Sequence, residues 1–355
     1  MKKSIYLYCS EIASYIGQNK WDYVTPFERL WKKCDTECYK AILERMQDNI
    51  ESAQNNIKEI EEKKKDIEES LKKKLITENV YNKEKKKLDE ECDKKQTVMK
   101  KMEENVEEIK LDQKQKLEKV MGKKIIEDIK VNDLGKNNIV ISKAIENLDI
   151  SKEKKKVLIK EAESFVNKTH GTKTEVDAIT MFEKKFNVKL DTSQEFHKKY
   201  LREISKDSQY DWYICGKLDG VYIGENEKYI VEVKNRTKAF FTTLRDYEKT
   251  QIHLYMCMLD INKAKLVEKY KEKIRITDIY ENKEYTEDVM KYLGVFISAF
   301  ENKFLNAFEK KCQYIESSTD DKKVLLKQLY ISDIAKMIDK KIEMEEEDCL
   351  IDDLD

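Results

Sequence analysis

The sequence has little proline, glycine or histidine and contains no long apolar run. Of its 355 residues one is proline (Pro26), 8 are glycine and 3 are histidine, whereas 40% are charged. Sandwiches and barrels need turn residues at short intervals, so this composition argues against an all-β fold and favours long, solvated helices. Without about 20 consecutive apolar residues, we expect no transmembrane helix.

Paired cysteines and a secretory leader are missing as well. The eight cysteines are scattered, and no signal-peptide pattern precedes them, which predicts a reduced, soluble, intracellular protein, in the cytoplasm or in the replication compartment of an infected cell. Three residues separate Cys34 from Cys38, a spacing that could begin a metal site. No second Cys or His pair has matching spacing, so we expect free thiols.

Charge is unevenly distributed along the chain. The net charge is −1, but residues 343–355 hold eight carboxylates and no base, which leaves about +7 on the remaining body. A modestly basic body is compatible with nucleic-acid binding but is common in proteins of other functions. We expect the acidic tail to be disordered, and its "CLIDDL" ending to dock on a partner or fold back on basic surface.

A helical arm is predicted between residues 40 and 122. Apolar residues follow alternating steps of four and three, with a few polar interruptions, in two stretches separated by "ITENVYNKEK". The first stretch comprises Met46, Ile50, Ala53, Ile57, Ile60, Lys64, Ile67 and Leu71, and the second Leu88, Cys92, Lys95, Met99, Met102, Val106 and Ile109. Two such helices favour an antiparallel coiled-coil hairpin; the alternative is one continuous, dimerising helix.

The tip of this arm is rich in lysine. Residues 72–87 hold seven lysines against Glu78 and Glu84. Such a segment is either an ordinary solvated surface or a contact for phosphate groups. Further along, residues 123–150 are predicted to be a linker with short helical pieces and a break at "LGKNN". A helix follows over 151–187, with an interruption at "HGT" and a buried face of Ala162, Phe165, Val166, Val176, Ile179 and Phe182.

Chemistry is concentrated in the stretch "CGKLDGVYIGENEKYIVEVKNRT". Val221 to Ile223 predict one strand, "GENEK" a hairpin turn and "YIVEVKN" the returning strand. Residues i and i+2 share a face of a strand, so Glu232 and Lys234 point the same way, and the hairpin can bring Asp219 close to Glu232. A buried pair of carboxylates needs a positive partner, and Mg²⁺ prefers oxygen ligands. The alternative is a surface hairpin with an incidental "EVK".

Two flanking helices carry further polar residues. Glu175, in "HGTKTE", could supply a third carboxylate. Gln251 and Tyr255 lie four residues apart in "DYEKTQIHLYMCML" and therefore share one helix face. His170 and His253 lie in the same two segments, and we expect both to be packing residues.

The order of these motifs resembles that of a known family. Ser10-Glu-Ile-Ala, Gly17, Trp21 and Thr25-Pro26 are followed by "HGTKTE", "GKLDG", "VEVK" and "QIHLY". This looks like the YqaJ-type viral recombinases, phage-lambda-exonuclease-like members of the PD-(D/E)XK nuclease superfamily. The resemblance covers about residues 1–33 and 160–310 and leaves out the arm and the acidic tail. It implies an α/β, restriction-endonuclease-like core with a small mixed sheet flanked by helices.

The resemblance also implies roles for individual residues. Catalytic residues would be Asp219, Glu232, Lys234, Glu175 and Gln251; metal ligands would be Asp219, Glu232, the Val233 carbonyl and Glu175; DNA-binding residues would be Ser10, Lys3, Tyr255 and Arg236. Two positions depart from the family pattern. Leu218 replaces the usual proline before the aspartate, and Lys3 replaces an arginine that holds a terminal 5′ phosphate, which puts strict 5′-phosphate selection in doubt.

The expected activity is that of a Mg²⁺-dependent DNA exonuclease, with Mn²⁺ as an alternative cofactor. Resection from 5′ to 3′ in viral or phage-type recombination and repair would follow, with linear duplex DNA and a strand-annealing protein as partners. A homotrimer is implied, although the arm could obstruct it. Two alternatives stay open: a scaffold built on a degenerate nuclease core, and an endonuclease of the same fold. The expected parts are 1–39 and 151–315 (core), 40–122 (arm), 123–150 (linker), 316–342 (C-terminal helix) and 343–355 (tail).

Overall fold

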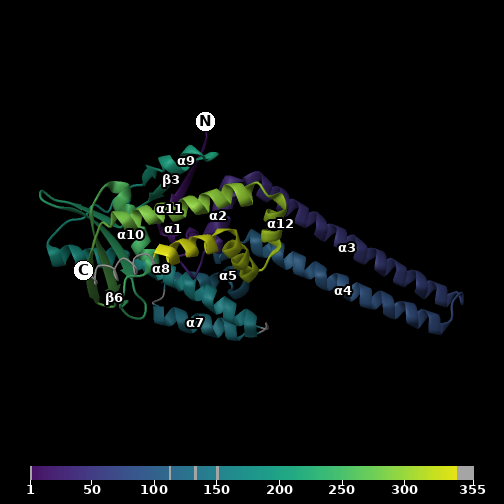
Figure 1. The fold of residues 1–355 in the computed structure, drawn as a ribbon. Helices are drawn as coiled ribbons and strands as arrows, with labels where there is room; N and C mark the ends of the chain where they lie inside the picture. Colours follow the sequence, from purple (N-terminus) through teal and green to yellow (C-terminus); the bar gives the residue numbers. More distant parts are fainter. Residues whose placement is uncertain (1, 112, 132–133, 149–151, 342–355) are drawn as a thin grey trace, which may run out of the picture. The chain divides into compact units, whose positions relative to one another are not determined.

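The structure is a computed structural model that describes residues 2–111, 113–131, 134–148 and 152–341. The chain divides into two compact units. One is Asp35–Ile126, and the other joins Met1–Cys34 to Glu127–Asp355. Helices predominate in both (Figure 1), and none of the described helices is long and apolar enough to cross a membrane.

The unit Asp35–Ile126 is built on two long helices, α3 (Thr36–Lys72) and α4 (Glu78–Lys110), followed by α5 (Gln113–Met121). Ile57 and Ile60 of α3 pack against Cys92, Leu88 and Met99 of α4. The ion pair of Lys64 with Asp89, 2.6 Å between Nζ and Oδ1, fixes an antiparallel register. These contacts use the predicted apolar repeat, and α3 and α4 form a hairpin rather than one continuous helix.

The turn between α3 and α4 follows from local chemistry. The amides of Lys73 and Lys74 donate to carbonyls of the last turn of α3, and Lys74 has a left-handed backbone with φ 55°. Thr77 then caps α4, because its hydroxyl accepts from the Val80 amide at 3.5 Å. A helix cannot continue through a left-handed residue, so the chain reverses here.

A three-stranded sheet lies at the N-terminus, in the order β1 (Lys3–Tyr8), β3 (Tyr210–Gly216), β2 (His197–Tyr200). β1 is parallel to β3 and β2 is antiparallel to it. Short helices follow two of the strands: α1 (Cys9–Tyr15) after β1 and α9 (Arg202–Lys206) after β2. The strand β3 therefore joins residues that are about 200 positions apart in the sequence.

A four-stranded mixed sheet contains the predicted hairpin. Its order is β4 (Gly220–Ile223), β5 (Lys228–Asn235), β6 (Lys263–Tyr270), β7 (Lys273–Tyr280). β4 and β5 are antiparallel and joined by a tight turn, which confirms the hairpin read from the sequence. β5 and β6 are parallel and are joined through α10 (Asp246–Leu259), as parallel neighbours require a crossover.

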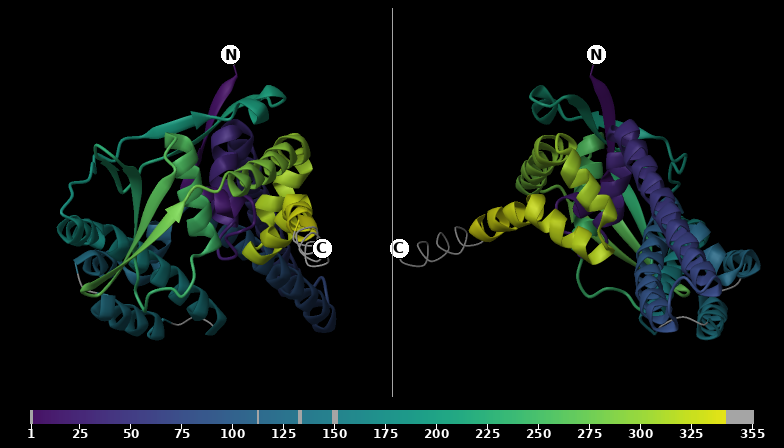
Figure 2. Two further views of the ribbon diagram at one scale, coloured as in Figure 1. Left: turned by 60° about the vertical axis from the view of Figure 1, so that its left-hand side comes forward. Right: turned by 90° about the vertical axis from the view of Figure 1, so that its right-hand side faces the viewer.

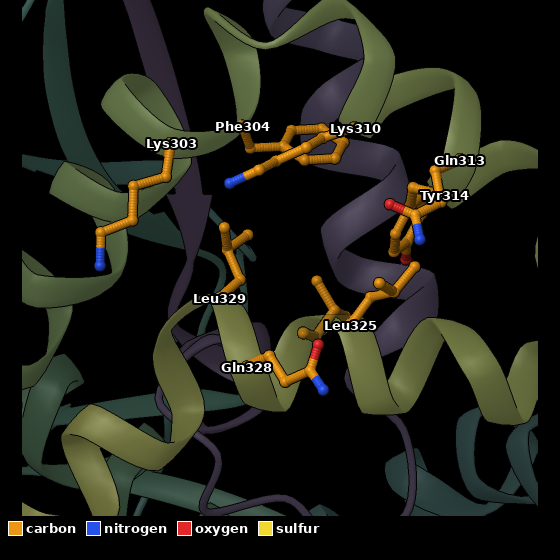
Figure 3. Close-up of a pocket in the computed structure, with 9 residues that line it drawn as sticks. Lys303, Phe304, Lys310, Gln313, Tyr314, Leu325, Gln328 and Leu329 are labelled. Carbon is orange, nitrogen blue, oxygen red and sulfur yellow. The ribbon is translucent and has the colours of Figure 1, made fainter.

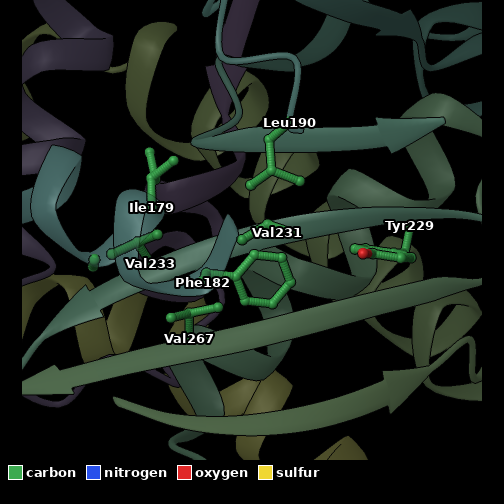
Figure 4. Packing of buried hydrophobic residues seen from close by; sticks show 8 residues of the cluster. Ile179, Phe182, Leu190, Tyr229, Val231, Val233 and Val267 are labelled. Carbon is green, nitrogen blue, oxygen red and sulfur yellow. The ribbon is translucent and has the colours of Figure 1, made fainter. Parts of the chain in front are cut away.

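Helices lie on both sides of this sheet (Figure 2). The helix α8 (Lys152–Phe186) packs Ile179 and Phe182 on Val231 and Val233 of β5 and on Val267 of β6 (Figure 4). Since side chains alternate along a strand, Glu232 and Lys234 point to the opposite side, toward α10. The core of the sheet thus fixes which face carries the charged residues.

Two predictions about the approach to α8 were wrong. The segment 123–150 was predicted to hold short helical pieces, and it contains α6 (Lys123–Val131) and α7 (Leu134–Glu146), but "LGKNN", expected as a break, begins α7. The helix α8 also runs through "HGT" without interruption. Glycine near a helix start costs little because the first amides need no intrahelical partner, and one glycine inside a 35-residue helix costs only about 1 kcal/mol.

The unbroken helix also corrects the predicted buried face. Val176 is 68% exposed, while Ala178, Ile179 and Phe182 are buried. At 3.6 residues per turn, Val176 lies about 120° from Phe182, whereas Glu175, seven residues before Phe182, lies on nearly the same face. The expected register assumed a break, and without that break the phase of the helix brings Glu175 to the side of the sheet.

The C-terminal region is a cluster of helices around an aromatic core. They are α11 (Lys283–Ala299), α12 (Phe308–Glu316) and α13 (Thr319–Leu326), with π-helical turns at Phe300–Leu305 and Lys327–Ile331 and a last helix over 332–341. Phe27, from α2 (Val24–Cys34), packs among Phe296, Phe300 and Phe304. The acidic tail predicted over 343–355 lies outside the described residues.

Candidate active site

The hairpin sets Asp219 opposite Glu232. Gly220 pairs with Val231 in the antiparallel register, so the residue before Gly220 faces the residue after Val231. One carboxylate oxygen of Asp219 (Oδ2) accepts a hydrogen bond from the Val233 amide at 2.7 Å. Asp219 is therefore held at the end of β4 by the backbone of β5, beside the side chain of Glu232.

Glu232, Lys234 and Gln251 form a closed triangle of hydrogen bonds. The Lys234 ammonium donates to Glu232 Oε1 at 2.6 Å and to Gln251 Oε1 at 3.1 Å. The Gln251 amide nitrogen donates to the same Glu232 oxygen at 2.8 Å. Glu232 is only 3% exposed and the Lys234 side chain 24%. The amine of Lys234 is thus positioned by two partners on different elements while part of the side chain still reaches solvent.

Glu175 reaches the same region from α8. Its Oε1 accepts a hydrogen bond from the Gln194 side chain at 3.2 Å. The carboxylate is only half-buried, and it interacts electrostatically with both Glu232 and Lys234. Since α8 packs on the opposite side of β5 from α10, Glu175 approaches the hairpin from the other face of the sheet.

The three carboxyl groups disfavour one another's charged forms. Burial, followed by the charge of Asp219, raises the pKa of Glu232. Burial, with a smaller contribution from Glu175, raises the pKa of Asp219, and burial followed by the charge of Glu232 raises the pKa of Glu175. Burial alone would lower the pKa of Lys234, but the nearby carboxylates outweigh it and the net shift is upward. The site holds more negative charge than Lys234 alone neutralises.

This donor set fits a small, hard divalent cation. Among the described residues, no group of three or more His, Cys, Asp or Glu side chains is arranged as a metal cage. Mg²⁺ does not require one, because it is usually held by one or two carboxylates together with water and substrate phosphates. Asp219 and Glu232 supply such a pair. The N–H and C=O of one strand residue point to the same side, so the Val233 carbonyl faces the side on which its amide meets Asp219.

Tyr255 and Gly216 position the loop that leads to Asp219. The Tyr255 hydroxyl donates to the Lys217 carbonyl at 3.0 Å and accepts from Gln251 at 3.3 Å. A Cβ atom at Gly216 would lie 2.6 Å from the Tyr255 ring, so only glycine allows this approach. Tyr255 is 4% exposed. It therefore supports the site from inside the protein, and the predicted contact with DNA stays a prediction.

The other residues expected to bind DNA are engaged within the protein or lie on its surface. The Lys3 ammonium donates to the carbonyls of Lys33 and Cys34, at 2.7 and 3.2 Å. Each of the three nitrogens of the Arg236 guanidinium donates to a carboxylate oxygen. Nη1 and Nη2 bind the two oxygens of Glu248, and Nε binds one oxygen of Glu268. The Arg236 side chain is 7% exposed, so contact with DNA would require these ion pairs to break. Ser10 is exposed on α1.

Residues that the sequence did not single out complete the surroundings. Glu248 is 1% exposed and joins α10 to Arg236, the residue that directly follows β5. It lies three residues before Gln251, hence on the same helix face, and this spacing was the signal that could have found it.

His253 is buried against the Tyr285 ring, 5.0 Å between centroids, and burial lowers the pKa of His253 to about 4, in keeping with a packing role. The side chain of His170 lies outside the described residues.

Two other features lie outside this site. Cys34 and Cys38 form no disulfide. A cavity of about 240 Å³ lies among the C-terminal helices, and its lining includes Lys303, Phe304, Lys310 and Leu329 (Figure 3). None of the residues of the candidate active site lines that cavity.

Comparison with known proteins gives only weak likenesses. No protein-family model and no curated protein matches the chain. The crystal structure of SSO0001 aligns with a TM-score of 0.31 and 16% identity, covering 43% of this chain and 73% of that one. An alkaline exonuclease from Laribacter hongkongensis, LHK-Exo, aligns with a TM-score of 0.29 and 10% identity, covering 53% and 87%. Scores this low assign neither fold nor activity, so the function has to be argued from the site itself.

Proposed function

We propose that this protein is a metal-dependent nuclease that hydrolyses DNA phosphodiester bonds at the Asp219–Glu232–Lys234 site. The observation that carries the proposal is the convergence of a buried carboxylate (Glu232), a half-buried carboxylate (Asp219) and one partly exposed ammonium, with Gln251 bridging Glu232 and Lys234. An uncompensated acidic pair is costly to bury. Such a pair is retained where a cation and an anionic substrate complete the charge balance.

Each residue has a distinct task in this proposal. Asp219, Glu232 and the Val233 carbonyl would hold Mg²⁺, or Mn²⁺ in its place, with Glu175 as a further carboxylate nearby. When bound, the cation would polarise a phosphate oxygen and stabilise charge that develops there. Lys234 places a positive charge where the reacting phosphate and the attacking water would meet. Gln251 keeps the Lys234 amine and the Glu232 carboxylate in register.

The finer assignment is a DNA exonuclease that resects duplex ends, from 5′ to 3′, in viral or phage-type recombination and repair. It is supported by the order of sequence motifs and by the basic charge of the body outside the acidic tail. A strand-annealing protein as partner, a homotrimer and an intracellular location, in the cytoplasm or a viral replication compartment, belong to the same proposal. The Lys3 position, which replaces an arginine, makes strict selection of a 5′ phosphate less favoured.

One assay tests the assignment. Linear duplex and covalently closed circular DNA are incubated with the full chain and Mg²⁺, with Asp219→Ala as the matched control. An exonuclease degrades the linear DNA alone and loses this activity in the variant. Nicking of closed circles would replace the exonuclease by an endonuclease. Absence of cleavage of both substrates, with Mg²⁺ or Mn²⁺, would overturn the proposed function in favour of a scaffold.

A further inference from the structure

The N-terminal sheet has one covered face and one open face. Ile5, Leu7, Trp212 and Ile214 are buried. From β2, Lys199 points to the same side, where its ammonium donates to the Cys257 carbonyl of α10 at 2.7 Å. Because side chains alternate along each strand, the neighbouring positions of all three strands project from the opposite face.

Aromatic rings cross that open face. The Tyr6 and Tyr213 rings are stacked with centroids 5.2 Å apart, and Tyr200 continues the row at 5.1 Å from Tyr213. Phe196, just before β2, meets Tyr6 edge-on at 6.2 Å. These four residues, from β1, β3 and the β2 region, form a continuous surface that we call the aromatic platform: Tyr6, Phe196, Tyr200 and Tyr213.

Two of the four platform residues are exposed, whereas Tyr6 and Tyr213 are half-buried. Phe196 is 44% exposed and Tyr200 42%, although both are large apolar side chains. Cross-strand aromatic pairs stabilise a sheet by roughly 0.2–1 kcal/mol each, which accounts for the pairing but not for leaving Phe196 and Tyr200 exposed at the end of the row. Contiguous apolar surface of this kind marks an interaction site.

The charge around the rings is suited to an anionic partner. The Lys198 ammonium lies 5.5 Å from the centroid of Tyr6 and 5.4 Å from that of Tyr213. On the adjoining Tyr8, which is 38% exposed, the Lys33 ammonium lies 5.0 Å from the ring centroid. Asp211 places an acid on this face, and it accepts a hydrogen bond from the Tyr200 hydroxyl at 3.2 Å.

The platform lies on the strand that leads into the candidate active site. Cys215 of β3 is in register with Tyr8 of β1 and with Lys198 of β2. Asp219 is only four positions after Cys215, a span of at most about 14 Å of extended chain. A strand held on the platform would therefore lie within a few nucleotides of the cleavage chemistry.

We propose that the aromatic platform binds single-stranded DNA, with bases stacked on Tyr6, Phe196, Tyr200 and Tyr213 and Lys198 beside the phosphates. Stacking on aromatic side chains is tolerant of sequence, and a duplex cannot use it because its bases are already stacked inside. The inference rests on the proposed function, since resection of a duplex leaves a single strand that needs guidance at the active site.

The first experiment measures binding without catalysis. A fluorescent oligo(dT) is titrated with the full chain in EDTA and read by anisotropy, with a blunt duplex for comparison. The variant Phe196→Ser/Tyr200→Ser should weaken single-strand binding at least tenfold, because loss of one base–aromatic contact costs about 1–3 kcal/mol, or roughly 5- to 150-fold. The matched control Phe308→Ser/Tyr280→Ser, at sites 43% and 65% exposed, should bind like wild type. The swap Phe196→Tyr/Tyr200→Phe should also retain binding.

A second measurement uses the unaltered protein, so it does not depend on how a variant folds. The wild-type chain is photocrosslinked to an oligonucleotide carrying 5-iodouracil, and the attached peptides are identified by mass spectrometry. Crosslinks within residues 196–200, or at Tyr6 or Tyr213, are expected. Crosslinks confined to other segments would overturn the proposal.

Other outcomes separate this proposal from the proposed function. Equal single-strand affinity of the platform variant and wild type, in a protein that cleaves DNA, would overturn the platform alone. An altered oligomeric state in the platform variant with unchanged DNA affinity would also overturn it, in favour of a protein contact. Absence of cleavage, combined with the expected loss of binding in the platform variant, would support the platform while refuting the nuclease.

Discussion

At the scale of single residues, the β4–β5 hairpin brings together carboxylates whose mutual repulsion opposes folding and an ammonium that partly neutralises them. Asp219 is half-buried beside the buried Glu232, and in the described part of the chain Lys234 is the one cation bonded to Glu232. Burying charge in this way stabilises nothing by itself. It supplies an electrostatic environment that a cation and a phosphodiester can complete.

Replacing Asp219, Glu232 or Lys234 by alanine should abolish cleavage while leaving the fold intact. Asp219→Ala and Glu232→Ala remove cation ligands, and Lys234→Ala removes charge stabilisation, for which a loss of about 10²-fold or more is expected. Cleavage of linear DNA under Mg²⁺ is measured, with Glu227→Ala, at an exposed position of the same hairpin, as control. Full activity in any of the three variants would refute the assignment of this site.

Replacing the Asp219 carboxylate by a neutral group should stabilise the folded protein, and this gain should depend on pH. The pKa of Asp219 is raised above its ordinary value of 3.8, so its contribution favours the folded state at low pH and is lost as pH rises through the raised pKa. Asp219→Asn, which can still accept from the Val233 amide, should therefore raise the Tm by a few degrees at pH 8 in EDTA but have little effect near pH 4.

Thermal unfolding at both pH values, with Asp207→Asn as an exposed control, checks this expectation. The wild type should also gain stability from added Mg²⁺, whereas Asp219→Asn should not, since a ligand that binds only the folded state raises its stability. A higher wild-type Tm than that of Asp219→Asn at pH 8 would contradict the electrostatic account.

At the scale of elements, each helix near the site combines a packing face with a functional position. In α8, Phe182 and Ile179 pack on the sheet, and the same face brings Glu175 to the hairpin two turns earlier. In α10, Glu248 binds Arg236 one turn before Gln251 reaches Glu232 and Lys234. A change that rotates either helix would therefore disturb the site without replacing any residue to which a catalytic role is proposed.

The lysines at the tip of the α3–α4 hairpin are either a solvated surface, a protein contact or a contact for phosphate groups, and the phosphate contact is the hypothesis that a salt series tests. Lys72, Lys73, Lys74, Lys86 and Lys87 are exposed, and Lys85 lies near Glu68 and Tyr81. Each lysine that neutralises a phosphate contributes close to one unit to the slope of log affinity against log salt. Changing these six to glutamine should flatten that slope for duplex DNA and shorten the stretch degraded per binding event.

Duplex DNA binding by the tip variant is measured at three salt concentrations. The control variant keeps the helices and removes the same charge elsewhere on the arm. The control changes six other exposed lysines of α3 and α4 to glutamine: Lys58, Lys63, Lys65, Lys94, Lys100 and Lys101. Equal slopes in the two variants would show that position on the arm is irrelevant. A wild-type slope in the tip variant would point to a protein partner instead.

At the scale of the whole molecule, the sign of the charge changes sharply at the C-terminal end. Residues 343–355 carry eight carboxylates, against a body of about +7. Carboxylates tethered to a basic protein compete with phosphates at low salt. Deleting residues 343–355 should therefore tighten non-specific DNA binding in low salt and have little effect at high salt.

A salt series of duplex binding by the full chain and the truncated chain measures this effect. A variant with all eight carboxylates changed to amides, at the original length, separates charge from steric bulk. If both altered chains bind like wild type at every salt concentration, the tail does not compete with DNA.

Local pattern determined much of this protein from the sequence alone. The four-three repeat placed α3 and α4, and the "GENEK" turn between two β-branched runs placed β4 and β5. Strand alternation put Glu232 and Lys234 on one face, and the hairpin register brought Asp219 to Glu232. These features depend on contacts between residues close in sequence, where the period of the apolar side chains fixes the geometry.

Only the tertiary structure decided the rest, because it depends on which distant segments meet. The unbroken path of α8 through "HGT" set the phase that exposes Val176 and directs Glu175 to the hairpin. Arg236 turned inward because Glu248 and Glu268 approach it from other elements. The aromatic platform exists because β1, β2 and β3 pair across some 200 residues. The spacing of apolar residues within each strand does not indicate which distant strands pair.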